Sequence, residues 1–308
     1  MTPGVLLLAY GGPAAPGDVR PFVEAVLRGR PGIAARIDEI ARRYEAIGGI
    51  SPLPAATAAQ AQGLALELAS RGRAVPVFVG MRFGRPSIAE ALAAAHAQGI
   101  DRLSALVLAP HRSHASREAY QEAVEQARRD APASGPAVRW AASWFDHEGF
   151  ISALADRVRE AVQREPAAGD AGAAWLLTAH SLPAAAPGVA TYAGDLRATA
   201  CSLAARFGDH AWRAAYQSRS AKGDEPWLGP DISTAIRDAA AARAPAVLAV
   251  PAGFVADNLE VRWDLDMEAA RVVAEAGLAF ARAGTVGTHP GFLRALADAA
   301  LPGLEESA

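Results

Sequence analysis

The chain has 308 residues, 51% of them hydrophobic and 20% charged, so it is long enough for two domains with substantial cores. Its net charge of −3 provides no basic excess for binding nucleic acid or an anionic membrane as the main partner. The single cysteine, Cys201, excludes an internal disulfide framework and any four-cysteine zinc or iron–sulfur site, and it suits a reducing cytoplasm.

The first half of the chain alternates short apolar runs with helical patterns. In chain order we predict a strand at Val5–Tyr10, helices at Asp18–Leu27 and Ile33–Ile47, a helix beginning at Ser51, a strand at Val75–Val79, a helix at Pro86–Gln98, a strand at Leu103–Ala109, a helix at Ser116–Asp130 and a strand at Val138–Ala142. Turn residues such as Gly48-Gly49 separate these elements.

The second half repeats this alternation. The predicted elements are a helix at Phe150–Arg164, a strand at Trp175–Thr178, a helix at Ala190–Phe207, a strand at Trp212–Tyr216, a helix at Asp231–Ala242, a strand at Ala246–Val250, an acidic helix ending near Ala276, a strand at Leu278–Ala281 and a helix at Pro290–Ala300. Such alternation is typical of parallel α/β domains. We therefore expect two similar domains, 1–145 and 146–308, with the helix at 289–301 as a candidate to return to the first.

Familiar catalytic motifs are absent from the sequence. The turn Gly11-Gly12-Pro13 lacks the G-x-G-x-x-G dinucleotide pattern, and no P-loop, G-x-S-x-G elbow or H-E-x-x-H motif occurs. These absences disfavour a dehydrogenase, a P-loop enzyme and a common hydrolase.

Two strand ends in the second half carry chemically useful side chains. His180 follows one strand, and Glu260 follows another and opens an acidic pattern continued by Asp264 and Glu268. Steps of four place the three carboxylates on one helical face, which for an arbitrary helix indicates a solvated surface. Ligands of open α/β sheets, however, bind at the carboxyl ends of strands. If His180 and Glu260 face each other, they form a pair that can bind a divalent cation or move protons.

Seven segments, in order and over nearly the whole length, resemble the ferrochelatases, enzymes that insert iron(II) into a porphyrin. The segments are LAYGGP at 8–13, LRGR at 27–30, RYEAIGGISPL at 43–53, AHSLP at 179–183, YQS at 216–218, PWLGPD at 226–231 and GFVADNLE at 253–260. The resemblance implies two Rossmann-like domains, each with a four-stranded parallel sheet, and an active-site cleft between them.

The resemblance also implies roles for particular residues. His180 and Glu260 match the family's catalytic pair, either one as proton acceptor or as metal ligand, and Asp264 and Glu268 match further metal-contacting carboxylates on a helix with a widened turn. Tyr10 matches a tyrosine of the coproporphyrin III enzymes of Gram-positive-type pathways, which favours coproporphyrin III, giving coproheme, over protoporphyrin IX. The further positions that match the substrate or regulatory-metal region are Arg28, Arg30, Ser51, Gln60 and Tyr120. Tyr216 stands where a close relative type has tryptophan, a change compatible with stacking on the substrate ring.

Several positions depart from the family's pattern. Asn258 stands where many members have a histidine, Leu27 replaces an arginine, and Arg82-Phe83 replaces a basic–histidine pair near a secondary metal site. Asn258 cannot titrate, so we expect the proton chemistry to rest on His180 and the carboxylates.

The expected enzyme is a porphyrin ferrochelatase of haem biosynthesis, a lyase. We expect a cytoplasmic monomer with no integral membrane segment and no nucleic-acid partner. Its substrates are a porphyrin and Fe(II), with no separate cofactor and no iron–sulfur cluster. The alternatives are a protoporphyrin IX ferrochelatase and, in another class, a non-catalytic tetrapyrrole or haem carrier.

Overall fold

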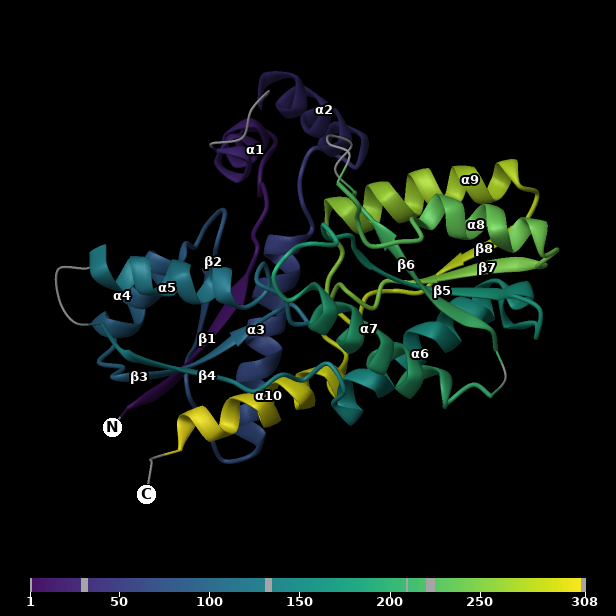
Figure 1. Ribbon diagram of the computed structural model, residues 1–308. Coiled ribbons are helices and arrows are strands. Elements are labelled where there is room, and N and C mark those ends of the chain that lie inside the picture. The colour runs from purple at the N-terminus through teal and green to yellow at the C-terminus, as the bar shows by residue number, and fades with distance from the viewer. Residues whose placement is uncertain (1, 29–32, 131–134, 209, 220–224, 306–308) are drawn as a thin grey trace. The chain divides into compact units, whose positions relative to one another are not determined.

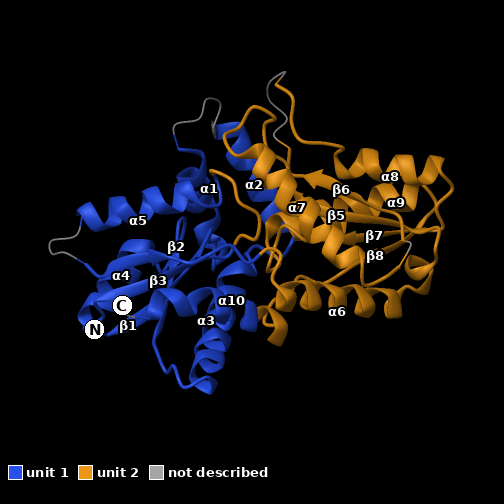
Figure 2. Cartoon of the chain, turned by 60° about the horizontal axis from the view of Figure 1, so that its bottom comes forward, with its two compact units in different colours: residues 1–108, 115–144, 293–308 blue, residues 109–114, 145–292 orange. Residues whose placement is uncertain are grey.

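The computed structural model describes residues 2–28, 33–130, 135–208, 210–219 and 225–305. The chain forms two compact units (Figure 2). The first unit comprises residues 1–108, 115–144 and 293–308, and the second comprises residues 109–114 and 145–292. Residues 293–308 therefore group with the N-terminal part of the chain, while the short segment 109–114 groups with the second unit.

Each unit contains one parallel sheet. The strands of the first are β1 (Pro3–Ala9), β2 (Val77–Met81), β3 (Arg102–Val107) and β4 (Ala137–Trp140), in the order β2-β1-β3-β4. Those of the second are β5 (Ala174–His180), β6 (Trp212–Gln217), β7 (Ala246–Val250) and β8 (Ala279–Arg282), in the order β6-β5-β7-β8. Every neighbouring pair runs parallel, which confirms the predicted fold class.

Helices connect successive strands. In the first unit they are α1 (Val19–Leu27), α2 (Ile33–Ala46), α3 (Leu53–Ser70), α4 (Ile88–Ala97) and α5 (Glu118–Asp130). In the second they are α6 (Glu148–Arg164), α7 (Val189–Ala204), α8 (Ile232–Ala241), a π-helix (Val261–Ala269) and α9 (Ala270–Glu275), and α10 (Pro290–Leu304) closes the chain. Two short 3-10 helices lie at Pro16–Asp18 and Pro166–Gly169. Among the helices that the structure describes, none combines the length and apolar character needed to cross a membrane.

The first sheet is covered on both faces, which explains the continuous apolar run of residues 5–9 in its central strand β1. Apolar residues of α4 and α5 pack on one face against side chains such as Leu6 and Leu8. Helices α3 and α10 lie on the other face (Figure 1). There the Ser104 hydroxyl donates to the Ala300 carbonyl of α10 at 2.9 Å. The pair α1 and α2 extends beyond the sheet, after β1.

The second sheet is also covered on both faces. Helix α8, the π-helix and α9 pack on one face, where Ile236, Leu265 and Val273 share a core with Leu176 and Val247. Helices α6 and α7 cover the opposite face (Figure 1). The π-helix therefore presents its apolar side to the sheet and leaves its polar side beside the strand ends.

Strand β2 is shifted by two residues at both ends relative to its prediction, and the ends of several other strands differ from their predictions by one or two residues. The sequence predicted Val75–Val79, whereas β2 begins at Val77 and ends at Met81. Pro76 has no backbone N–H to donate to a neighbouring strand. Its carbonyl still accepts from the Val5 N–H at 2.9 Å, so pairing with β1 starts there and continues past Val79.

His111, which follows β3, is part of the core of the second unit. Its side chain is 1% exposed, and its Nε2 lies 3.1 Å from the Thr199 hydroxyl, which donates to the Phe145 carbonyl at 3.0 Å. That hydroxyl therefore accepts from His111, which fixes an Nε2–H. Burial lowers the pKa of His111 to about 3, although the Asp195 carboxylate raises it. The folded chain thus keeps this imidazole neutral.

The buried His111 predicts a loss of stability in mild acid. Its folded pKa lies below the ordinary value of 6.5, so the unfolded chain takes up a proton first as the pH falls. Stability present above pH 6.5 is lost between pH 6.5 and about 3, at up to about 1.4 kcal/mol per pH unit. We expect the wild type to lose about 2 kcal/mol more than His111→Gln between pH 6.5 and 5. Urea denaturation of both proteins measures this difference, and equal pH dependence would contradict it.

Candidate active site

The carboxyl ends of β6, β5 and β7 meet at one edge of the second sheet. His180 at the end of β5 is in register with Gln217 at the end of β6. After β7, the Gly253 N–H donates to the Thr178 carbonyl at 2.9 Å, which holds the loop 251–258 against β5. A Cβ on Gly253 would lie 2.7 Å from that of Ala179, so only glycine allows this approach.

His180 and Glu260 form a contact pair. The His180 Nε2 lies 3.3 Å from the Glu260 Oε1, and the two side chains are 39% and 35% exposed. On the other side of the ring, Nδ1 lies 2.5 Å from the Ser181 carbonyl, which can only accept, so Nδ1 carries a proton. A contact between Nε2 and a carboxylate oxygen then needs one further proton between them.

The surroundings of His180 favour its charged form. Partial burial lowers the pKa of the imidazole, but the Glu260 carboxylate, the Ser181 carbonyl and the Asp264 carboxylate raise it, giving a pKa of about 9. At neutral pH the pair is therefore an imidazolium facing a carboxylate. Because both side chains are partly exposed, solvent screens the pair and its contribution to folding is small.

The three carboxylates of the acidic pattern have different environments. Glu260 is partly exposed, Asp264 is 5% exposed and Glu268 is exposed. A uniformly solvated face is therefore wrong for this segment. The helix widens into a π-helix at Val261–Ala269, as the resemblance implied, and such turns often mark functional sites.

Asn258, the departure within this segment, caps the helix. Its Oδ1 accepts from the Val261 N–H at 2.9 Å, the bond typical of a helix N-cap. Asn258 therefore positions the start of the helix that carries Glu260 and Asp264.

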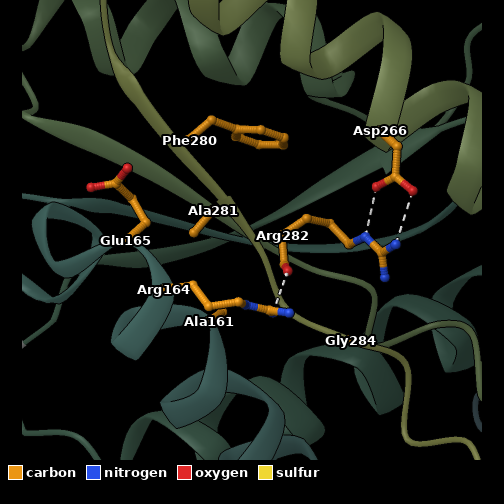
Figure 3. Close-up of a pocket in the computed structure, with 8 residues that line it drawn as sticks. All are labelled: Ala161, Arg164, Glu165, Asp266, Phe280, Ala281, Arg282 and Gly284. Carbon is orange, nitrogen blue, oxygen red and sulfur yellow. Dashed lines mark hydrogen bonds and ion pairs between the residues drawn. The ribbon is translucent and has the colours of Figure 1, made fainter.

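Two other carboxylates near the π-helix form ion pairs with arginine. Arg282, at the end of β8, donates to Asp266 at 2.7 and 2.9 Å and to Asp257 at 3.3 Å, and Arg262 lies 3.0 Å from Asp257. Figure 3 shows the Arg282–Asp266 pair at the wall of an open pocket of about 380 Å³, where Arg164 donates to the Arg282 carbonyl. These pairs anchor the π-helix to β8.

The predicted substrate contacts of the first unit lie in contrasting environments. Tyr10, just after β1, is 41% exposed, and its ring lies 6.4 Å from Phe22 and 5.0 Å from Phe83. Ser51 is 5% exposed, and its hydroxyl oxygen accepts from the Leu53 N–H at 3.3 Å. Of the remaining predicted contacts, Arg28 is exposed, Gln60 and Tyr120 are buried in α3 and α5, and Arg30 lies outside the described residues. Their roles stay predictions.

Two departures from the family pattern have local structural explanations. Leu27 is 2% exposed and completes the apolar face of α1. The Arg82 guanidinium lies 5.2 Å from the Phe83 ring centre and 5.9 Å from that of Tyr120. These are cation–π distances, so Arg82 and Phe83 form an aromatic–cation cluster.

Tyr216 and Gln217 lie side by side at the end of β6 but point to opposite faces of the sheet. Tyr216 is 5% exposed, and its predicted substrate contact stays a prediction. Gln217 and Ser218 contact the π-helix, a role that sequence reasoning missed. The only available signals were the position of Gln217 at a strand end and the segment YQS.

Of the predicted metal ligands, His180 and Glu260 form the close pair. Within the part of the chain that the structure describes, no three or more His, Cys, Asp or Glu side chains are grouped to hold a metal ion. Metal binding by Asp264 and Glu268 stays a prediction.

Comparisons with known proteins identify the family. The family model described as Ferrochelatase matches residues 2–303. A protein named coproporphyrin III ferrochelatase from Nocardia farcinica is 38% identical over 96% of this chain and 86% of its own length. A protein of the same name from Mycolicibacterium vanbaalenii is 35% identical over 96% of this chain and 88% of its own length.

A solved structure shares the fold. The sirohydrochlorin chelatase SirB from Bacillus subtilis subspecies spizizenii, in complex with cobalt, superposes with a TM-score of 0.60 at 11% identity, over 99% of this chain and 96% of that one. At this identity the likeness shows the two-sheet fold alone. Family assignment rests on the matched family model and on the two sequence relatives, and it agrees with a His–Glu pair at the strand ends. The chain belongs to the ferrochelatase family.

Proposed function

We propose that this protein inserts Fe(II) into coproporphyrin III to give coproheme, a step of haem biosynthesis. The observation that carries the proposal is the His180–Glu260 contact at the carboxyl edge of the second sheet, in a chain of the ferrochelatase family. The proposal keeps the expectation of a cytoplasmic monomer. Fe(II) acts as substrate, and no iron–sulfur cluster is involved, since the chain has one cysteine.

Metal insertion requires a proton acceptor and a set of metal-ligating atoms at one place. A free-base porphyrin carries two pyrrole N–H protons, which must leave before the metal occupies the ring. The Nε2 of His180 and the carboxylate of Glu260 supply one nitrogen and one oxygen donor, a set suited to Fe(II). The same two atoms hold a proton in the substrate-free pair, so metal and proton compete for them.

Proton removal continues along the acidic helix. The imidazolium of the resting pair must release its proton before His180 can act as a base. Asp264 lies on the next turn after Glu260, and its carboxylate is one of the groups that raise the pKa of His180. Glu268 follows and is exposed to solvent. Glu260, Asp264 and Glu268 thus form the route that we propose for protons, and for iron in the opposite direction.

Two observations support coproporphyrin III as the porphyrin. The relatives from Nocardia farcinica and Mycolicibacterium vanbaalenii bear that substrate in their names. Tyr10, the residue that favours this substrate by resemblance, presents a partly exposed aromatic ring at the end of β1, flanked by Phe22 and Phe83. Such a ring is suited to lie against a planar macrocycle.

A two-substrate assay tests the proposal. Purified protein is incubated anaerobically with Fe(II) and either coproporphyrin III or protoporphyrin IX, and the porphyrin absorption bands are followed. We expect a kcat/KM for coproporphyrin III at least about 10-fold higher, because two additional propionates are bound. Faster insertion into protoporphyrin IX would overturn the substrate assignment. Quenching of porphyrin fluorescence without any change in the bands would indicate a carrier and overturn the enzyme assignment.

A further inference from the structure

Gln217 is placed between the catalytic pair and the acidic helix. It ends β6 directly opposite His180, and its backbone carbonyl accepts from the Ser181 N–H at 2.8 Å. Its side chain, 3% exposed, reaches the first turn of the π-helix. There the Nε2 donates to the Glu260 carbonyl at 3.0 Å and, at 3.4 Å, to Asp264 Oδ2.

The partners fix the orientation of the Gln217 amide. The Glu260 carbonyl and the Asp264 carboxylate can only accept, so the amide nitrogen must face them. The amide oxygen is then directed elsewhere and is buried, with no hydrogen-bond partner among the described protein atoms. An unpaired buried oxygen costs stability. A glutamine at this position is therefore unfavourable for packing alone. The hydrogen bonds that its Nε2 donates explain why the residue is there.

Ser218 provides a second locally unfavourable feature at the same point. Its φ is +63°, in the left-handed region that serine seldom adopts. In this conformation its hydroxyl donates a hydrogen bond to Asp264 Oδ2. Strain of this kind persists where surrounding structure holds it, and it concentrates at functional sites.

Both features converge on one carboxylate oxygen. We infer that Gln217 and Ser218 are positioning residues that hold the Asp264 carboxylate beside Glu260, and that they set the rate of metal insertion through Asp264. This inference rests on the proposed function. Gln217 also occupies the Glu260 carbonyl from outside the helix, which supports the widened first turn. Arg282 holds the same helix from β8 through Asp266, so the two contacts orient the acidic face together.

Gln217→Met tests the contact, because methionine keeps the length of the side chain but cannot donate. We expect kcat for iron insertion to fall about 10-fold, the effect typical of losing a partner that orients a reactive group. The KM for porphyrin should stay within about 2-fold, and the Tm should not fall, since the unpaired oxygen is removed as well. Unchanged kcat would overturn the inference.

Arg213→Met is the matched control. Arg213 also lies on β6 and donates to a helix carbonyl, that of Ala235 at 2.6 Å, but it contacts α8 and not the π-helix. We expect its kcat to equal that of the wild type. An equal loss of kcat in both variants would show that any β6–helix contact matters and would overturn a specific role for Gln217.

A double-mutant cycle shows whether Gln217 acts through Asp264. If it does, adding Gln217→Met to Asp264→Asn should lower kcat no further than Asp264→Asn alone. If the two substitutions instead lower kcat independently, so that their fold-losses multiply in the double variant, the inference is overturned.

If Gln217→Met fails to fold, Ser218→Gly carries the test, because glycine relieves the left-handed strain while removing the hydroxyl. We expect a lower kcat for Ser218→Gly with an equal or higher Tm, and an unchanged kcat would count against the inference.

The proposed function and this inference fail in different ways. A wild-type protein that inserts Fe(II) into neither porphyrin overturns the proposed function. An active wild type whose Gln217 and Ser218 variants retain full kcat overturns the inference alone.

Discussion

Replacing His180 by alanine is expected to reduce kcat for iron insertion about 1,000-fold while the protein stays folded. The substitution removes the Nε2 atom that lies 3.3 Å from Glu260 Oε1. That nitrogen is both the proposed metal ligand and the proposed proton acceptor. General acid–base groups typically contribute about 10²- to 10⁴-fold, and loss of a metal donor adds to this. The cost in stability should be below about 1 kcal/mol, because the pair is partly exposed and screened.

The measurement pairs a rate with a fold control. Insertion of Fe(II) into coproporphyrin III is followed spectrophotometrically, and the Tm of each variant is recorded by circular dichroism. His96→Ala, at an exposed position near the end of α4, is the matched histidine control and should keep the wild-type rate. A His180→Ala protein that retains more than about a tenth of the wild-type kcat would remove His180 from the catalytic role.

Most of the fold was predictable because parallel strands covered on both faces are continuous apolar runs. Leu6 to Leu8 and Ala246 to Val250 are fully buried, and no polar residue interrupts either run. Their alternation with helical patterns indicates the parallel sheets. The start of β2 was harder to predict, because Pro76 takes part in pairing only through its carbonyl.

The candidate site was predictable only in part. His180 and Glu260 follow strands, and the edge of a parallel sheet collects such residues, so their proximity could be expected. The roles of Asp257, Asp264 and Asp266 could not be told apart in the sequence. Their partners depend on the rotation of the widened helix, which turns Asp266 toward Arg282 and Asp264 toward Ser218. The left-handed conformation of Ser218 has no sequence signal, since glycine and asparagine are the usual residues there.

Gly253→Ala is expected to destabilise the protein by about 3 kcal/mol and to lower kcat as well. The new Cβ would lie 2.7 Å from the Ala179 Cβ and 2.8 Å from its Cα, distances that no side-chain rotation relieves. Overpacking of this kind typically costs about 1–3 kcal/mol. The loop 251–258 must move away from β5, which weakens the Gly253 N–H contact to the Thr178 carbonyl and carries Glu260 away from His180. Because a misplacement of about 1 Å can cost about 100-fold in rate, we expect at least a 10-fold loss of kcat.

Gly194→Ala is the control that separates packing from conformational freedom. Gly194 lies on the exposed side of α7, and a Cβ there meets nothing within 4 Å, so alanine should raise stability by about 0.5–1 kcal/mol through its higher helix propensity and leave kcat unchanged. Urea denaturation and insertion assays on both variants, well below the Tm, measure the two effects. Wild-type stability in Gly253→Ala would contradict the close packing of the loop on β5. Reduced stability with an unchanged kcat would mean that this packing holds the loop but does not set the distance between Glu260 and His180.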